Sequence, residues 1–318
     1  MQTVFLNAKK IDFDGKLDFS PIMECGIIQT YESSTNDEII ERVQNQNIVV
    51  TKEMPIGREL IEKFPPCVKM ICEAGTGYNN IDIAAAKSKG IAVCNIPSYS
   101  TEAVAQLAIA LILSLSSSIA RQQVMLKQNN YRNFYRCLGV PHSEINQKIL
   151  GVIGTGRIGQ RVIHSALALG MNVLCYSRTK KEWDNPRVNF TSLEALLSHS
   201  DFVSIHCPLT PETKRLINKE TLALMKSTAY VINTSRGAII NEADLIDALK
   251  RGIIAGAALD VFEKEPPDID NPLFTMNHVI LTPHIGWKCI ETRQRLLQLI
   301  AGNIQAFQKG KPINVVNG

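Results

Sequence analysis

The sequence predicts an α/β protein with two domains, each a doubly wound parallel sheet. Short apolar runs alternate with helix-like segments along most of the chain, which is typical of parallel strands joined by crossover helices. A long apolar helix near residue 100 separates two such series. The length of 318 residues also suits two domains, at roughly 100 to 200 residues each.

The composition excludes several classes of protein. With 45% hydrophobic and 20% charged residues, the chain can bury a core and is not disordered. A net charge of +4 is too small for a protein that binds nucleic acid through its phosphates. The eight cysteines include no C-x-x-C pair, so we expect reduced thiols and no metal site. No signal or transit pattern is found in MQTVFLNAKK, and no apolar run reaches the ~20 residues that cross a bilayer. We therefore expect a cytoplasmic protein without a membrane partner.

The first series predicts five strands and three helices. The strands are TVFLN, GIIQTY, NIVVT, VKMICEAG and IAVCNIP. The helices lie near residues 36–45, 55–64 and 81–89. Pro97 and Ser98 end this pattern, and a long helix then begins near Ser100, where Ser100 or Thr101 can cap it.

The second series predicts at least six strands, enough for a complete doubly wound domain. They are KILGVIG, MNVLCYS, DFVSIHC, AYVINTS, AGAALDVF and HVILTPH. One helix begins at about residue 157, and three more lie near residues 192–198, 219–225 and 242–251. A last amphipathic helix, near residues 288–309, has no sheet of its own, so it can pack on the first domain and make that domain discontinuous.

A glycine motif follows the first strand of the second series. Gly154, Gly156 and Gly159 form G-x-G-x-x-G directly after KILGVI and open a helical pattern. Glycine is needed at the tight turn, where backbone approaches a pyrophosphate, and where the helix meets the strand. In this context the motif favours a Rossmann dinucleotide-binding domain over a turn that binds nothing.

The end of the next strand bears on the choice between NAD and NADP. NAD-binding units carry an acidic residue about 20 positions after the glycines, which binds the ribose hydroxyls. Ser177 stands in that place, followed by Arg178, Thr179 and Lys180. A 2′-phosphate would meet no negative charge at Ser177, and Arg178 can bind it. We therefore expect NADP to be preferred over NAD, although the same residues also occur in ordinary solvated turns.

Three polar residues, Arg236, Glu265 and His284, follow strands of the second series. Ligands of open parallel sheets bind outside the carboxyl ends of the strands, so these residues can converge on one site. Each alone also fits a surface turn. The spacing does not decide between these interpretations.

Six segments of the chain, taken in order, carry a family resemblance. They are AGTGYNNIDIAAAKSKGIAVCNIPSYSTEAVAQ, GVIGTGRIGQ, CPLTPETKRLIN, VINTSRGAIINEADLIDAL, GAALDVFEKEP and LTPHIGW. They resemble the signatures of the D-isomer-specific 2-hydroxyacid dehydrogenases over nearly the whole chain. The resemblance implies a Rossmann dinucleotide-binding domain over residues 100–285, inserted into a substrate-binding domain of residues 1–99 plus 286–318.

The resemblance also places the family's catalytic residues on Arg236, Glu265 and His284. Reducing a 2-keto acid to a D-2-hydroxy acid requires a hydride, a proton and a group that holds the carboxylate. A histidine titrates near neutral pH and can donate the proton, while the glutamate orients its ring. The planar fork of an arginine suits the carboxylate. The backbone amides of Gly77 and Tyr78 are implied as a second anchor for that carboxylate.

Further residues are implied to bind the cofactor. Arg157 and Ile158 are implied at the pyrophosphate, Cys207, Pro208 and Thr213 near the adenosine half, Thr234 along the cofactor, and Asp260, His284 and Gly286 near the nicotinamide. Cys207 and Pro208 also fit a plain strand end, and we expect His206 in the core.

The end of the chain bears on the substrate. HIGW and the closing GNIQAFQKGKPINVV are similar to the glycerate dehydrogenase and hydroxypyruvate reductase branch, so we expect reduction of hydroxypyruvate or glyoxylate. Trp287 either lines the substrate pocket or packs at the domain junction. A phosphoglycerate or D-lactate type dehydrogenase remains an alternative, and so does a dinucleotide-sensing protein similar to corepressors. No regulatory domain follows within the sequence and GTGYNNID has no basic side chain, with Lys52 the neighbouring candidate for a phosphate, which disfavours the phosphoglycerate enzyme.

Two further expectations concern the competing activity and the assembly. The set of Arg236, Glu265 and His284 disfavours a sensor, because a sensor has no use for an acid-base pair. The apolar surface of the helix from Ser100 predicts a homodimer that buries this helix.

Overall fold

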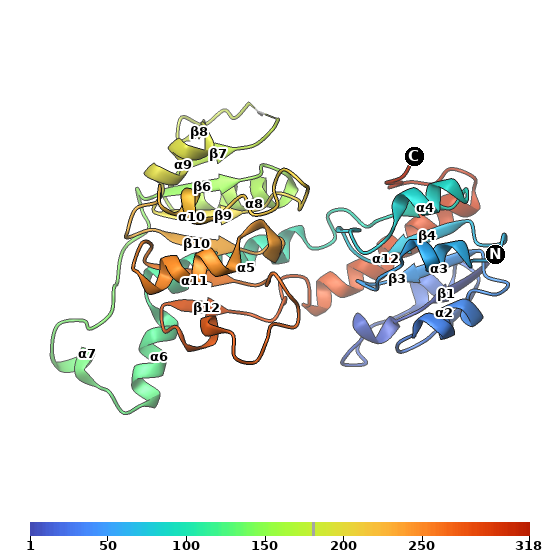
Figure 1. The fold of residues 1–318 in the computed structure, drawn as a ribbon, viewed down its shortest axis with the longest axis horizontal. Helices are drawn as coiled ribbons and strands as arrows, with labels where there is room; N and C mark the ends of the chain where they lie inside the picture. Colours follow the sequence, from blue (N-terminus) through green and yellow to red (C-terminus); the bar gives the residue numbers. More distant parts are fainter. Residues whose placement is uncertain (180–181) are drawn as a thin grey trace. The chain divides into compact units, whose positions relative to one another are not determined.

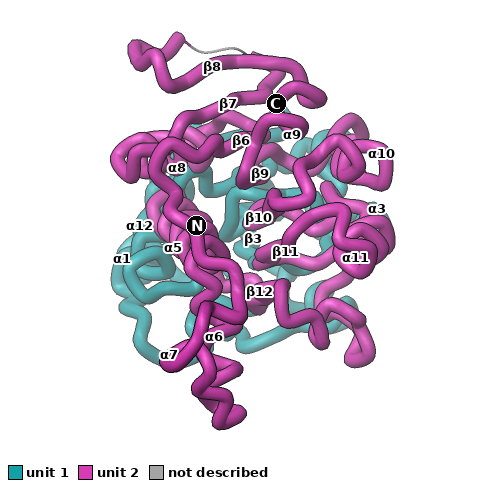
Figure 2. The backbone as a smooth tube through the Cα atoms, turned by 90° about the vertical axis from the view of Figure 1, so that its left-hand side faces the viewer, with its two compact units in different colours: residues 1–100, 287–318 teal, residues 101–286 magenta. Residues whose placement is uncertain are grey.

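The computed structural model describes residues 1–179 and 182–318, so Lys180 lies outside the described residues. The chain divides into two compact units, coloured separately in Figure 2. Unit 1 comprises Met1–Ser100 and Trp287–Gly318, and unit 2 comprises Thr101–Gly286. The sequence predicts that the domains meet after residues 99 and 285, and the two units of the structure meet after residues 100 and 286.

Unit 1 contains a five-stranded parallel sheet with the order β2-β1-β3-β4-β5. Its strands are β1 (Gln2–Phe5), β2 (Ile27–Thr30), β3 (Ile48–Thr51), β4 (Met70–Glu73) and β5 (Ala92–Cys94). Its helices are α1 (Ser20–Met23), α2 (Asn36–Arg42), α3 (Arg58–Glu62), α4 (Ile83–Ser88), α12 (Ile290–Gln308) and the 3-10 helix η1 (Ala8–Lys10). The sequence misses only α1 and η1, because elements this short show no helical period.

Helices pack on both faces of this sheet. Successive strand residues point to opposite faces, so Val49 packs in the same cluster as residues of α2, α3 and α4, while Met70 packs with α12. From α12, Leu296, Leu297 and Ile300 are fully buried in this second cluster. The last helix of the chain therefore completes the core of the first unit.

Unit 2 contains a seven-stranded parallel sheet with the order β12-β11-β10-β9-β6-β7-β8 (Figure 1). Its strands are β6 (Ile149–Ile153), β7 (Asn172–Tyr176), β8 (Val188–Phe190), β9 (Phe202–Ile205), β10 (Tyr230–Asn233), β11 (Gly256–Leu259) and β12 (Val279–Leu281). Its helices are α5 (Thr101–Ser116), α6 (Ile119–Lys127), α7 (Arg132–Tyr135), α8 (Arg157–Ala168), α9 (Leu193–His199), α10 (Lys219–Leu222) and α11 (Glu242–Lys250), with the 3-10 helices η2 (Gly237–Ile239) and η3 (Pro272–Thr275). The sequence misses β8, an edge strand of three residues without an apolar run.

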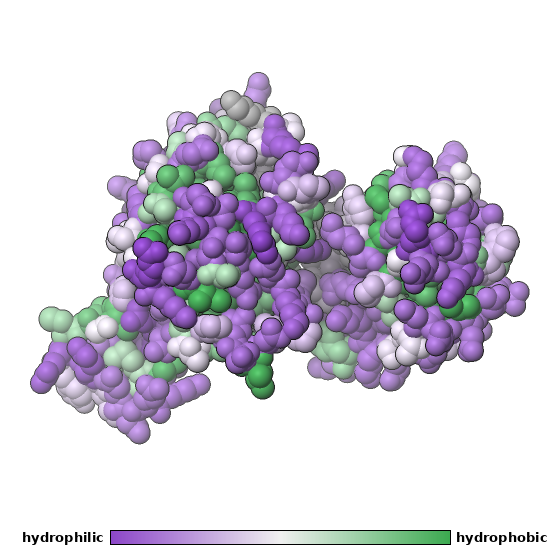
Figure 3. All heavy atoms as spheres, in the orientation of Figure 1, coloured by the Kyte–Doolittle hydropathy of each residue, from purple (hydrophilic) through white to green (hydrophobic). Residues whose placement is uncertain are grey.

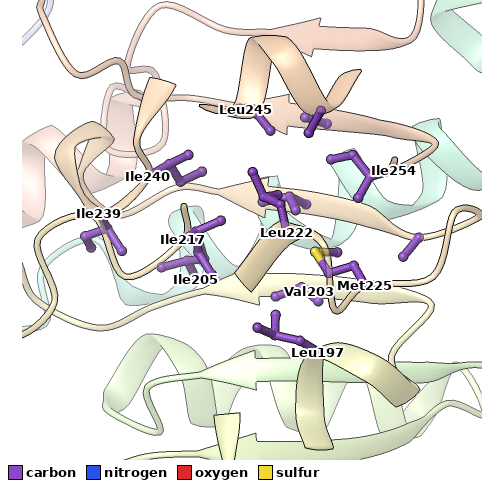
Figure 4. Packing of buried hydrophobic residues seen from close by; sticks show 14 of the residues in the cluster. Leu197, Val203, Ile205, Ile217, Leu222, Met225, Ile239, Ile240, Leu245 and Ile254 are labelled. Atoms are coloured by element: carbon purple, nitrogen blue, oxygen red, sulfur yellow. The ribbon is translucent and has the colours of Figure 1, made fainter. Parts of the chain in front are cut away.

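Helices also cover both faces of the second sheet, so the predicted fold class of two doubly wound parallel sheets is confirmed. Figure 4 shows one face, where Leu197 of α9, Leu222 of α10 and Leu245 of α11 pack around Val203 and Ile205 of β9. α5 and α8 cover the other face. Since all seven strands are parallel, their carboxyl ends lie along one edge.

Most apolar residues of α5, such as Ala108, Leu111 and Ile112, are buried in the core of unit 2, whereas Leu113 is 36% exposed. That a homodimer buries this helix stays a prediction. A group of exposed apolar side chains lies on residues 119–138, which we call the arm; Figure 1 shows α6 and α7 extending from the rest of unit 2, and Figure 3 shows hydrophobic residues on this part. They are Ile119, Val124, Tyr131, Phe134, Tyr135 and Leu138.

No single helix among the described residues is long and apolar enough to span a membrane. Only α5 and α6 taken together have the length and the apolar composition of a membrane span, and the two helices are separated by a bend of 60°.

Candidate active site

The glycine motif forms the turn from β6 to α8, where the strand order reverses. Gly154 has a φ of +95°, and a Cβ there would lie 2.6 Å from the Cys207 nitrogen. A Cβ on Gly159 would lie 2.1 Å from the Gly154 oxygen, so packing requires glycine at both positions. Gly156 has a φ of −67°, and a Cβ on this residue would meet nothing within 4 Å. Neither backbone nor packing requires glycine there, which suits the close approach of a phosphate.

The start of α8 fits the diphosphate of a dinucleotide. Gly156 is the N-cap and provides no side chain to cap the helix. The first amides of a helix have no acceptor within it, so those of Arg157 and Ile158 can bind an anion at the positive end of the helix dipole.

The predicted adenosine end lies on two loops. Ser177 follows β7, and Arg178 and Thr179 are exposed. Thr210 and, more weakly, Arg178 lower the pKa of Glu212, so the Arg178 cation lies near the second loop. In that loop the Thr213 hydroxyl donates to the Pro208 oxygen over 2.7 Å and accepts from the Thr210 amide over 2.7 Å. Thr213 therefore holds the loop that begins at Pro208.

Unpaired polar atoms lie along the same edge of the sheet. Within the described ranges, Thr155 Oγ1, His206 Nδ1 and Thr234 Oγ1 are buried without a hydrogen-bond partner. These residues follow the adjacent strands β6, β9 and β10. Buried polar atoms are rarely unpaired, so this group indicates a polar ligand or water.

The ring of His206 is buried, as expected, but only one of its two nitrogens has a hydrogen-bond partner among the described residues. Its Nε2 lies 2.8 Å from Ser204 Oγ, and burial lowers the pKa of the ring to about 4. The neutral ring keeps an unpaired nitrogen at the site edge. Sequence reasoning misses Thr155 and His206 because no sequence pattern reveals whether a buried atom finds a partner.

The structure brings His284 and Glu265 together. His284 Nδ1 lies 2.8 Å from Glu265 Oε2, and the other oxygen of Glu265 accepts the Phe262 amide over 3.0 Å. His284 has a φ of +51°, in the left-handed region that few side chains adopt, and its amide donates to the Asp260 oxygen over 2.9 Å. The pair is therefore oriented by backbone contacts on both sides.

Asp260 supports the segment that carries His284. It is only 1% exposed, and its Oδ1 accepts from the Thr282 hydroxyl over 2.6 Å and the Ile285 amide over 2.8 Å. Its Oδ2 accepts the Gly286 amide over 2.9 Å. The sequence does not predict this positioning role of Asp260. The contact of Asp260 or Gly286 with a nicotinamide stays a prediction.

Arg236 lies on the loop after β10. Its guanidinium has one hydrogen bond among the described residues, 2.8 Å to the Ser235 oxygen, so most of its donors remain available. A Cβ on Gly237 would lie 1.9 Å from the Phe262 carbonyl carbon, so glycine lets this loop pack directly against the loop that holds Glu265.

In unit 1, the loop after β4 offers two consecutive amides. The Gly75 oxygen accepts the Ile96 amide over 2.8 Å, and the Thr76 oxygen accepts from Asn95 Nδ2 over 2.7 Å. Gly77 and Tyr78 are partly exposed residues, and their amides have no acceptor in the part of the chain that the structure describes. Successive amides of this kind bind anions, which agrees with the predicted carboxylate anchor. Trp287, in contrast, is a buried packing residue of unit 1.

The chain is similar to proteins of known activity. Residues 109–286 match the family model for the NAD binding domain of D-isomer specific 2-hydroxyacid dehydrogenases. A hydroxypyruvate reductase of Blautia hydrogenotrophica is 40% identical, over 98% of this chain and 97% of the relative. A glyoxylate reductase of Thermococcus litoralis is 40% identical, over 88% and 86%. The structure of an Aquifex aeolicus D-lactate dehydrogenase with NAD and lactic acid superimposes with a TM-score of 0.87 at 31% identity, covering 100% and 99% of the chains.

Proposed function

The chain belongs to the D-isomer specific 2-hydroxyacid dehydrogenases, a family of oxidoreductases, and on this premise we propose that it reduces hydroxypyruvate and glyoxylate to the corresponding 2-hydroxy acids with NAD(P)H. The observation that carries the proposal is the 2.8 Å pair of His284 Nδ1 and Glu265 Oε2 next to the Arg236 loop. The names of the two similar reductases support this choice of substrates.

In the proposed reaction His284 is the acid. Glu265 holds Nδ1, which leaves Nε2 to donate a proton to the carbonyl oxygen of the keto acid. Glu265 also stabilises the charged imidazolium before the proton leaves. The guanidinium of Arg236 binds the substrate and stabilises negative charge that develops on its oxygen. The nicotinamide, when bound, supplies the hydride.

The same residues give the proposed roles in binding. The amides of Gly77 and Tyr78 bind the substrate carboxylate. The diphosphate of the cofactor binds at Gly156, Arg157 and Ile158. Thr155 and Thr234, at the carboxyl ends of the strands, make further polar contacts with the cofactor. Thr213 and Asp260 keep the roles implied by the resemblance.

We further propose that NADPH is preferred over NADH. Ser177 offers no carboxylate to the ribose, and the exposed Arg178 can pair with a 2′-phosphate. Ser177→Asp should lower kcat/KM with NADPH about 10-fold, the effect of about 1.4 kcal/mol of repulsion, while NADH is affected less. Initial rates with each cofactor measure the change, and an unaltered preference would contradict this role of Ser177.

The function is tested by initial rates with hydroxypyruvate, glyoxylate, pyruvate and phosphohydroxypyruvate, each with NADPH and NADH and ranked by kcat/KM. The highest values for hydroxypyruvate and glyoxylate support the proposal. A preference for pyruvate or for phosphohydroxypyruvate would assign the D-lactate or phosphoglycerate type instead. Tight cofactor binding without turnover of any keto acid would favour a dinucleotide sensor.

We also propose a cytoplasmic homodimer formed through the arm. Its exposed aromatic side chains, Phe134 at 73% and Tyr135 at 83%, form an apolar surface of the kind that partners cover. All eight cysteines are free thiols that form no disulfide, which suits a reducing compartment.

A further inference from the structure

A cluster of buried charged side chains lies in unit 1, next to the loop after β4. Lys52 follows β3 and is 2% exposed, and Glu73 ends β4 and is 0% exposed. Charged groups are costly to bury unless they are paired. The catalytic proposal above uses neither residue.

Contacts on several sides hold the Lys52 ammonium. Nζ lies 2.8 Å from Glu53 Oε1, 3.5 Å from the Tyr99 hydroxyl and 4.1 Å from the centre of the Trp287 ring. Asn7 holds the Lys52 backbone through hydrogen bonds of 2.9 and 2.7 Å. Burial opposes the charge, but Tyr99, Glu53 and the nearby Glu73 outweigh it and raise the pKa of Lys52. The ammonium is thus charged and engaged within unit 1.

Glu73 connects the loops after β3 and β4. Its Oε1 accepts the Glu53 amide over 2.9 Å, and its Oε2 accepts from Asn80 Nδ2 over 2.9 Å. The same Asn80 amide group donates to the Met54 oxygen over 2.8 Å. Burial raises the pKa of Glu73 to about 7, and the Lys52 cation opposes this rise. The charge on Lys52 therefore helps to keep Glu73 ionised.

The cluster touches the loop backbone at Gly75. A Cβ on this residue would lie 3.1 Å from Lys52 Nζ and 3.2 Å from Glu73 Oε1, closer than side chains normally approach. The ammonium and the carboxylate therefore pack against the loop two residues before Gly77.

We propose that Lys52 is a positioning residue for substrate binding, which orients the amides of Gly77 and Tyr78 and balances the Glu73 carboxylate close to them. This inference rests on the proposed function of that loop. Without the cation the loop loses its packing partner at Gly75, and the buried Glu73 takes up a proton, which weakens its hydrogen bonds to the Glu53 amide and to Asn80.

The first test compares Lys52→Met with Lys9→Met, which removes an exposed lysine of the same unit. Lys52→Met should raise KM for hydroxypyruvate about 10-fold and change kcat less than about 2-fold, the pattern expected when binding shared by ground and transition states is lost. The dissociation constant of NADPH and the Lys9→Met enzyme should be unchanged. Lys52→Arg should recover most of the loss, because a guanidinium also stacks on an indole. Equal KM values for Lys52→Met and wild type would overturn the proposal.

The second test leaves every charge in place. Gly75→Ala puts a methyl group 3.1 Å from Lys52 Nζ and 3.2 Å from Glu73 Oε1, so both groups must shift away from the loop, and KM should rise in the same direction. Gly57→Ala is the matched control, because nothing lies within 4 Å of its Cβ and its φ is −80°. If Lys52→Met does not fold, Gly75→Ala decides the question alone, and a KM equal to that of Gly57→Ala would overturn the proposal.

A third measurement does not depend on activity. Hydrogen exchange of the amides of Ile96 and Ile81, which bond to the Gly75 and Tyr78 oxygens, reports the order of the loop. Exchange at both should be faster in Lys52→Met and Gly75→Ala than in the two controls, and unchanged exchange would overturn the positioning role. If wild type reduces no keto acid, the proposed function fails, while exchange still decides whether Lys52 orders the loop.

Discussion

His284, the proposed proton donor, is held in place by its neighbours. Glu265 fixes Nδ1, the Phe262 amide fixes Glu265, and Asp260 binds the amides of Ile285 and Gly286. Such supporting contacts orient a catalytic ring without touching substrate. A single substitution at His284 thus tests the chemistry apart from the fold.

His284→Ala should reduce kcat by about 10³-fold or more while leaving the dissociation constant of NADPH nearly unchanged, because only the proton donor is lost. Steady-state rates and fluorescence titration of NADPH measure the two effects. His199→Ala, which removes an exposed imidazole on α9, is the control. Wild-type turnover in His284→Ala would refute the proton-donor role.

His206 should make stability depend on pH. Burial lowers its pKa from 6.5 to about 4, so between these values the unfolded chain binds a proton that the folded chain does not. The contribution is present above pH 6.5 and is lost as pH falls toward 4, by up to about 3 kcal/mol. Urea midpoints at pH 7 and pH 5 should differ less for His206→Asn than for wild type. Identical pH dependence in both proteins would contradict this account.

At the scale of elements, local signals determine where helices begin, and distant contacts determine where they pack. Thr35 forms a capping box with Glu38 at the start of α2, and Asp82 and Ser192 cap α4 and α9, as short polar side chains do. α12 has no cap of this kind at Cys289. The buried Arg293 of this helix pairs instead with Asp14, which lies nearer the surface.

The pair of Arg293 and Asp14 should stabilise unit 1. Arg293 is 2% exposed and makes two bonds of 2.8 Å to Asp14 and one of 2.8 Å to the Ile11 oxygen. Arg293→Met should lower the free energy of unfolding by about 2 kcal/mol, because the oxygen of the buried Ile11 loses its hydrogen-bond donor. Arg251→Met, which breaks the exposed pair with Asp247, should cost less than about 1 kcal/mol. Urea denaturation measures both, and equal losses would show that burial of Arg293 adds nothing.

At the scale of the whole molecule, the arm is the surface that an assembly can use. Wild type should sediment as a species of twice 35.2 kDa at micromolar concentration. Phe134→Ser combined with Tyr135→Ser should shift it toward the monomer, because exposed aromatic residues dominate interfaces. Ile269→Ser, at a 98% exposed apolar residue outside the arm, is the control. A wild-type monomer would exclude the dimer.

The sequence by itself determined the fold class, most strands and helices, the glycine turn and the residues that resemble a family's catalytic set. These features depend on the period of apolar residues, on glycine at special backbone positions and on short motifs, all of which are local. The sequence does not predict β8 and α1, because elements this short cannot show a periodic pattern of apolar residues. The position of Ser177 at the end of β7 was predicted in the same way, from its distance along the chain to the glycine motif.

Only the tertiary structure decided which residues surround those motifs. It paired His284 with Glu265, placed Asp260 behind them, left His206 with an unpaired nitrogen and buried Lys52 against Gly75. It also showed a group of exposed apolar side chains on the arm and buried most of those on α5. These outcomes depend on contacts between residues far apart in the chain, whose burial and hydrogen bonding no local pattern records.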